Sequence, residues 1–218
     1  MKKSAILIAA LFFVGLAPAY AEDGSRLFQR KGCYTCHGQN GASPIAPSYP
    51  VLAGQRADYI FNQIKSFSGK HRSVKPKGGT AEERRENQKV LLFPNQMVPF
   101  ANSINKEGDD VIKSIAGFLA AQTPKTHNTI DSGLAAEGEK LFAERGCTAC
   151  HGEAGIAVEG LNAPNLAGLS PEYIQRQLVA FRNGTRSGTD TIAMMAPMAA
   201  TVNEKESAQI ANYLGSLK

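Results

Sequence analysis

Two short motifs hold the residues of this 218-residue chain that are best suited to chemistry. Each motif has the order Cys-x-x-Cys-His, which is typical of covalent haem attachment. Two thiols one helical turn apart can each bond one vinyl group of a haem, and the next imidazole can then bind the iron. The sequence therefore predicts two haem c groups, bonded to Cys33, Cys36, Cys147 and Cys150 and ligated by His37 and His151.

Other uses of four cysteines explain the pattern less well. Disulfides suit an exported protein, but they do not require a histidine after each pair. Zinc is disfavoured because the two pairs lie 114 positions apart. A thioredoxin-like redox pair needs a βαβ setting, and no strand pattern is present.

A sixth iron ligand is expected from methionine. Met97 and Met195 both precede x-Pro and hold equivalent positions, so we predict that they ligate the irons. A thioether opposite histidine raises the haem potential. Core packing is the alternative role for a methionine, and Met194 is the rival of Met195.

Two further pairs of residues are candidates for contact with the cofactor. Pro50 and Pro164 each lie 13 residues after a motif histidine, so their carbonyl groups can accept its ring N–H. Arg72 and Arg186 can pair with haem propionates, and a solvated surface charge is an equally good interpretation.

An internal duplication positions these residues. Many residues at an offset of 114 positions are identical: Gly24 matches Gly138, and the two Cys motifs match each other. The residue 114 positions later is also the same for Tyr59, Ile60, Gln63, Phe67 and Arg72. The offset falls to 98 at the methionines, so the first copy has 16 extra residues. They lie within about 73–95, which we expect to form a surface loop with a short helix over 81–90. His71 and His127 have no counterpart and are expected at the surface.

Helical patterns dominate both copies, so we predict an all-α fold. The expected helices are 25–31, 57–67 and 108–121 in the first copy, and 135–145, 171–181 and 204–217 in the second. We expect an N-terminal domain over 22–122, a linker over 123–130 and a C-terminal domain over 131–218.

The N-terminus has the layout of a secretory signal peptide. Two lysines precede the apolar stretch 5–16, and a small-x-small site ends at Ala21. We predict cleavage after Ala21 and export, in a bacterium to the periplasm. An uncleaved anchor is the alternative, but the apolar stretch is short of the roughly 20 residues of a membrane span.

The chain resembles the dihaem cytochrome c4 family. The resemblance rests on two Cys-x-x-Cys-His-Gly motifs, a Leu-Ala-Gly after each, and Met-x-Pro before each final helix. It implies two tandem all-α cytochrome c domains related by a pseudo-twofold axis, each wrapped around one covalent haem. It also implies electron transfer among periplasmic respiratory partners, such as a quinol-oxidising complex and a terminal oxidase or reductase.

Composition and charge narrow the function further. With 43% hydrophobic and 20% charged residues, the chain fits neither a disordered nor a multi-pass membrane protein. Residues 22–125 carry a net charge of +6, and residues 126–218 carry −3. This asymmetry suits an oriented electron carrier rather than a nucleic-acid-binding protein.

Two other functions remain as alternatives to a carrier that is not an enzyme. One is the cytochrome subunit of a periplasmic dehydrogenase that oxidises sulfide or an alcohol. The other is a dihaem enzyme, which needs an open iron or a cysteine ligand. That alternative is disfavoured because the four cysteines are committed to attachment and each iron has a methionine available.

Overall fold

The computed structural model describes residues 23–69, 71, 72, 80–187 and 193–218. The expected signal peptide, 1–21, lies outside these ranges, as does part of the 73–95 segment. Across the described ranges the regular structure is entirely helical, which confirms the predicted class. No helix in these ranges is long and apolar enough to cross a membrane.

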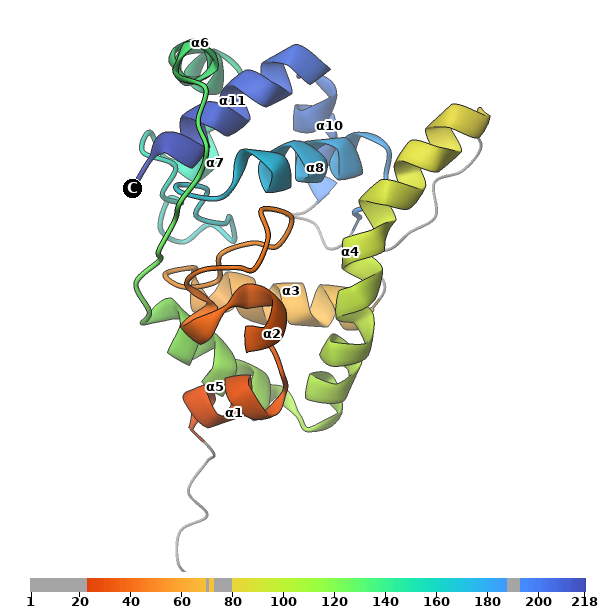
Figure 1. Ribbon diagram of the computed structural model, residues 1–218, viewed down its shortest axis with the longest axis vertical. Coiled ribbons are helices and arrows are strands. Elements are labelled where there is room, and N and C mark those ends of the chain that lie inside the picture. The colour runs from red at the N-terminus through yellow and green to blue at the C-terminus, as the bar shows by residue number, and fades with distance from the viewer. Residues whose placement is uncertain (1–22, 70, 73–79, 188–192) are drawn as a thin grey trace, which may run out of the picture.

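The helices form two domains stacked one above the other (Figure 1). The N-terminal domain contains α1 (Gly24–Arg30), α2 (Tyr34–His37), η1 (Gln39–Gly41), α3 (Ala57–Ser68), α4 (Ala81–Lys106) and α5 (Asp109–Ala120). The C-terminal domain contains α6 (Ser132–Glu144), α7 (Thr148–His151), α8 (Pro171–Arg182), α10 (Met195–Ala200) and α11 (Glu204–Ser216). An extended segment after α5 runs along one side and joins the two domains (Figure 1).

The first and last helices of each domain cross at a glycine. A Cβ atom on Gly138 of α6 would lie 2.0 Å from the Gln209 carbonyl oxygen of α11. A Cβ atom on Gly24 of α1 would lie 2.1 Å from the Ser114 carbonyl oxygen of α5. The duplicated glycines therefore allow two helix backbones to approach within contact distance.

Each domain has a separate apolar core. The core of the N-terminal domain includes Leu27, Phe28, Ile104, Ile112 and Leu119, which are at most 2% exposed. The core of the C-terminal domain is built around Phe142, Ile174, Val202, Ile210 and Leu214. Burial of these side chains is the main force that holds each helical layer together.

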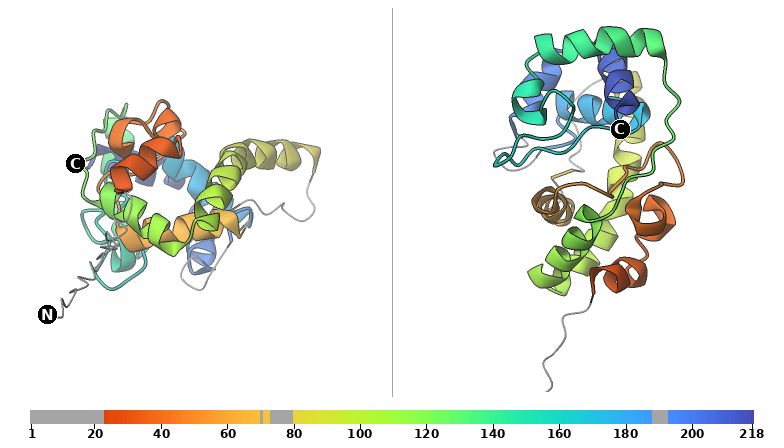
Figure 2. Two further views of the ribbon diagram at one scale, coloured as in Figure 1. Left: turned by 90° about the horizontal axis from the view of Figure 1, so that it is seen from below. Right: turned by 90° about the vertical axis from the view of Figure 1, so that its left-hand side faces the viewer.

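Helix α4 differs from the sequence expectation. A helix does begin at Ala81, but it continues to Lys106 instead of ending near residue 90. It passes through Pro94 and Pro99, each of which removes a backbone donor and normally disfavours a helix interior. Its N-terminal end projects away from both domains (Figures 1 and 2). The segment is therefore a helical arm that leads directly into the residues around Met97.

Candidate functional site

The Cys-x-x-Cys-His motifs fold into two equivalent short helices. Cys33 is the N-cap of α2, and Cys36 and His37 end that helix. The His37 N–H donates to the Cys33 carbonyl oxygen at 3.1 Å, which closes the turn. Cys147, Cys150 and His151 repeat this arrangement around α7. The turn places both thiols and the imidazole of each motif on the lining of one cavity.

Both motif histidines are buried and oriented by a backbone carbonyl. His37 is 5% exposed, and its Nδ1 lies 3.0 Å from the Pro50 carbonyl oxygen. His151 is 6% exposed, and its Nδ1 lies 3.1 Å from the Pro164 carbonyl oxygen. Burial lowers the pKa of both imidazoles, which favours the neutral form that binds metals.

The second ring nitrogen of His37 provides a test of whether the site fits a haem iron. His37 Nε2 is buried and has no hydrogen-bond partner among the described residues. Buried polar atoms are nearly always paired, so an unpaired one on a cavity wall needs a ligand. An iron atom bound at Nε2 would satisfy it while Pro50 holds the other nitrogen. The residues present therefore fit the haem that the motif predicts.

The alternative uses of the cysteines find no support in the structure. The four thiols, all within the described residues, are free rather than paired in disulfides. No group of three or more His, Cys, Asp and Glu side chains suited to a metal ion occurs in the described part of the chain. Burial raises the pKa of the Cys33 thiol to about 11, so its surroundings are apolar rather than those of a reactive thiolate.

The two predicted methionine ligands lie on the same cavity as the histidines. Met97, in α4, is half-buried and packs against the N-terminal core. Met195 begins α10, is half-buried, and packs against Phe181. Its rival Met194 is 60% exposed. Both histidines and both predicted methionines line one continuous cavity of about 450 Å³, which Met194 and Met198 also line.

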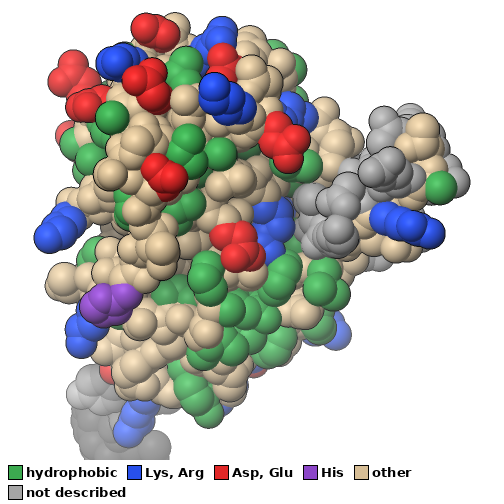
Figure 3. All heavy atoms as spheres, turned by 45° about the horizontal axis from the view of Figure 1, so that its top comes forward, with side chains coloured by type: hydrophobic (Ala, Val, Ile, Leu, Met, Phe, Trp, Pro, Cys, Tyr) green, Lys and Arg blue, Asp and Glu red, His purple; other side chains and the backbone are tan. Residues whose placement is uncertain are grey.

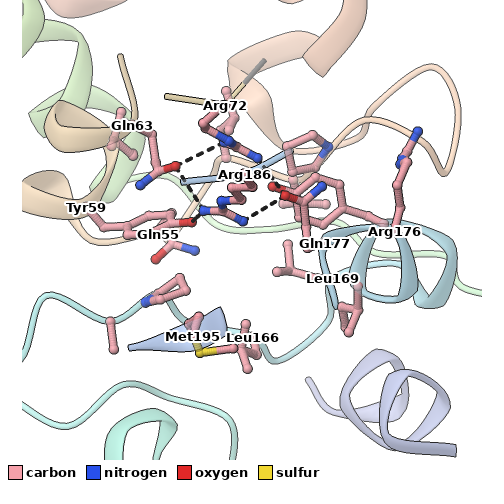
Figure 4. A pocket seen from close by; sticks show the side chains of 18 of the residues that line it. Gln55, Tyr59, Gln63, Arg72, Leu166, Leu169, Arg176, Gln177, Arg186 and Met195 are labelled. Atoms are coloured by element: carbon pink, nitrogen blue, oxygen red, sulfur yellow. Dashed lines mark hydrogen bonds between the residues drawn. The ribbon is translucent and has the colours of Figure 1, made fainter. Parts of the chain in front are cut away.

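Arg72 and Arg186 lie in the interface between the domains, where they form a cluster with two glutamines (Figure 4). Arg72 donates to Gln63 Oε1 at 3.0 Å and to Gln177 Oε1 at 2.7 Å. Arg186 donates to Gln177 Oε1 at 2.7 Å and to Gln63 Oε1 at 3.0 Å. Each arginine therefore bonds the glutamine of its own domain and that of the other domain. We call these four residues the arginine–glutamine cluster.

The arginines of this cluster are buried charges. Arg72 is 5% exposed and Arg186 is 6% exposed, so the expectation of a solvated surface charge is wrong for both. Their guanidinium groups stack on Phe67 and Phe181, at 4.3 and 4.4 Å from the ring centroids. Burial and then the charge of Arg186 lower the pKa of Arg72. The sequence of one copy did not show this burial, because a side chain that bonds each arginine comes from the other domain.

Within the described ranges, no carboxylate balances the buried charges of Arg72 and Arg186. Neither arginine forms a salt bridge with Asp or Glu among the described residues, and the Nε atoms of both are buried without a partner there. Two buried cations side by side are costly unless anions approach them. The cavity wall therefore has the donor set and charge that two propionate groups would match.

Sequence reasoning missed the polar partners of these arginines. Tyr59 accepts a hydrogen bond from Arg186 at 2.9 Å. Burial raises the pKa of its counterpart Tyr173, but the charges of Arg72 and Arg186 outweigh this effect and lower it. The same tyrosine and the same glutamine occur at matching positions in both copies, and this repetition could have indicated their role. As expected, His71 and His127 are exposed.

Comparison with known proteins agrees with this geometry. The cytochrome c family profile matches the chain twice, over residues 21–116 and 135–218. Cytochrome c4 of Pseudomonas aeruginosa is 29% identical over 97% of this chain and 96% of its own length. A "Thiosulfate dehydrogenase electron acceptor" of Stutzerimonas stutzeri is 30% identical over 91% of this chain and 88% of its own. The crystal structure of reduced recombinant cytochrome c4 from Pseudomonas stutzeri, 27% identical, matches with a TM-score of 0.68 over 90% of this chain and 99% of that chain.

Proposed function

Because this chain belongs to the cytochrome c4 family of dihaem c-type cytochromes, we propose that it carries electrons between partner proteins through two His/Met-ligated haems. Its two haem c groups are covalent, and each Cys-x-x-Cys-His motif attaches one of them. When bound, each haem supplies a one-electron redox centre. The observation that supports iron binding by His37 is its Nε2 atom, which is buried on the cavity wall and has no partner among the described residues.

The residues around each iron have distinct roles in this proposal. His37 and His151 would ligate the irons through Nε2, and the carbonyl groups of Pro50 and Pro164 hold each imidazole through Nδ1. Met97 and Met195 would supply thioether ligands, which favour the ferrous state. A histidine and a methionine on each iron would leave no position open for a substrate, so the protein would transfer electrons without substrate chemistry.

The arginine–glutamine cluster binds the propionates in this proposal. The buried Nε donors of Arg72 and Arg186 are available to carboxylate oxygens, and their two positive charges can balance two of the four propionates that two haems carry. Gln63 and Gln177 keep the guanidinium groups in position from across the interface. This arrangement explains why two cations are buried together.

The ligand assignment is tested by single replacements of the methionines. We expect Met97→Ala and Met195→Ala each to remove about half of the Met–iron charge-transfer absorbance of the oxidised protein, because each affects one haem of two. Met194→Ala is the matched control and should leave the band intact, since this side chain is 60% exposed. An unchanged band in the Met97→Ala/Met195→Ala double variant would refute both assignments.

We further propose a periplasmic location and respiratory partners, a quinol-oxidising complex as donor and a terminal oxidase or reductase as acceptor. The charge asymmetry supports an oriented encounter, because the N-terminal part is basic and acidic side chains gather over the C-terminal domain (Figure 3). The basic domain then meets an acidic partner surface. Association rates measured by stopped flow should fall as ionic strength rises, and a rate that does not fall would contradict this docking mode.

A second candidate function is the electron acceptor of a dehydrogenase. It is favoured by one observation, the similarity over nearly the whole chain to a protein described as a "Thiosulfate dehydrogenase electron acceptor". The two functions are separated by measuring haem reduction by a thiosulfate-oxidising enzyme and by a quinol-oxidising complex under the same conditions. Co-purification with a larger oxidoreductase subunit would favour the dehydrogenase partner.

A further inference from the structure

One cluster at the domain interface breaks the symmetry of the two halves. Arg176, on α8 of the C-terminal domain, reaches the N-terminal haem site, where it stacks on Phe93, which in turn contacts Tyr49. Arg176 corresponds to Asn62 in the first copy, and Tyr49 corresponds to Ala163 in the second. The sequence therefore supplies this arrangement at one haem site and not at the other.

Aromatic contacts connect the Arg176 charge to the predicted iron ligand. The guanidinium carbon lies 4.3 Å from the centroid of the Phe93 ring. Phe93 meets the Tyr49 ring edge to face, with centroids 5.2 Å apart and an interplanar angle of 89°. Tyr49 in turn lies 6.2 Å from the His37 ring at 73°, and its hydroxyl group donates to Gln96 at 3.1 Å.

The same arginine fixes the chain segment that orients His37. Arg176 Nη2 donates to the carbonyl oxygen of Ser48. Two residues further along the chain, Pro50 accepts the His37 hydrogen bond. Hydrogen bonds from Ser48 to Glu172 and from Ser170 to Pro47 attach this segment to the start of α8. The C-terminal domain therefore holds the loop that sets the His37 ring plane.

Arg176 has no ion-pair partner in the part of the chain that the structure describes. It is half-buried and forms no salt bridge among the described residues. Glu172, one turn earlier on α8, is exposed and hydrogen-bonded to Ser48, so water screens its charge more strongly. Arg72 and Arg186 are shared by the two sites through the arginine–glutamine cluster. Arg176 is thus a positive charge that distinguishes the N-terminal haem site from the C-terminal one.

We propose that Arg176, supplied by the C-terminal domain, is a positioning residue that raises the reduction potential of the N-terminal haem. A positive charge beside a haem disfavours the ferric state, which carries one more positive charge than the ferrous state. The potential of this haem therefore depends on how the two domains are docked. The inference rests on the proposed electron-carrier function and deepens it, because it assigns a difference in reduction potential between the two haems to one side chain.

The test is a spectroelectrochemical titration of the holoprotein with Arg176→Gln, with each haem followed by its own haem-methyl NMR signals. A half-buried unit charge that Phe93 and Tyr49 separate from His37, at an effective dielectric constant of about 20, changes the equilibrium constant for reduction by roughly tenfold. A tenfold change is 59 mV for one electron. We expect a fall of about this size at the N-terminal haem and no shift at the C-terminal haem.

Matched variants separate charge from structure. Arg182→Gln removes the same charge from the same helix, but the described partners of Arg182, Val202 and Ser207, lie in its own domain, so the N-terminal haem should not shift. Arg176→Lys keeps the charge and should retain most of the potential. Glu172→Gln removes a nearby negative charge and should raise the reduction potential of the N-terminal haem, by a smaller shift than that of Arg176→Gln.

The outcomes distinguish this inference from the proposed function. Absence of two reversible one-electron transitions in the unmodified protein would overturn the electron-carrier proposal itself. With those transitions present, the inference is overturned if Arg176→Gln shifts neither haem or both equally, or if Arg176→Lys shifts as far as Arg176→Gln. If Arg176→Gln does not fold, a Glu172→Gln variant with an unchanged or lowered N-terminal potential would also overturn it.

Discussion

Gln177 links the two buried arginines, so its replacement should destabilise the interface strongly. Its Oε1 atom accepts one hydrogen bond from Arg72 and one from Arg186, both at 2.7 Å. In a Gln177→Leu variant both donors lose this partner while they remain buried. Hydrogen bonds to charged groups contribute about 1.5–3 kcal/mol each, so the free energy of unfolding should fall by about 3–6 kcal/mol. For a protein of this size the melting temperature should fall by about 6–24 °C.

Scanning calorimetry of the holoprotein measures this effect directly. Gln175→Leu is the matched control, because it makes the same change on the same helix at a residue with no side-chain hydrogen bond to the described residues. We expect Gln63→Leu to resemble Gln177→Leu with a somewhat smaller loss, since its two bonds are 3.0 Å long. A loss below about 1 kcal/mol, or a loss equal to that of the control, would show that the cluster does not hold the domains together.

Two further predictions concern the helix crossing and a surface ion pair. Gly138→Ala should lower the free energy of unfolding by about 1–3 kcal/mol in denaturant titrations, because the new Cβ meets the Gln209 carbonyl oxygen. Gly117→Ala should instead raise it by roughly 0.5–1 kcal/mol, since nothing lies within 4 Å of that Cβ; equal effects of the two would refute the packing argument. Hydrogen bonds from Arg30 and then Lys31 lower the pKa of Glu107 to about 2. Ionised Glu107 therefore stabilises the fold at a pH above the pKa that it has in the unfolded chain, and this stabilisation is lost as pH falls from about 5 to 2. Glu107→Gln should therefore flatten the acid dependence of unfolding in that range, whereas Asp110→Asn, the control at an exposed pair, should not.

Local sequence signals were sufficient for most helices of the fold. Helix α8 begins at Pro171, as expected for the range 171–181, and its N-cap Ser170 accepts the Tyr173 N–H through its hydroxyl group at 3.1 Å. Helix α4 was misjudged beyond residue 90, because two prolines argue against a helix when the chain is read locally. Tertiary packing of Met97 and its neighbours against the N-terminal core outweighs that local preference.

The candidate site was predictable only within each copy. The motif histidines and their proline carbonyl groups are 13 residues apart, and the structure brings them within hydrogen-bond distance. The partners of Arg72 could not be identified from one copy, because Gln177 is 105 residues away and belongs to the other domain. The Arg176 contact with Phe93 was harder still, since it has no counterpart in the repeat.

The reciprocal bonding of the arginine–glutamine cluster has an evolutionary consequence. Gln63 bonds Arg186 while Gln177 bonds Arg72, which is the pattern of an isologous dimer interface. A single ancestral domain with one such glutamine and one such arginine would have a self-complementary surface, on which two identical chains could pair before their genes were joined. Fusion then allowed the two halves to diverge, and residues such as Arg176 and Tyr49 could be acquired by one half alone. The twofold contacts are thus those that two identical domains could make with each other, whereas the contacts of Arg176 and Tyr49 require two different domains.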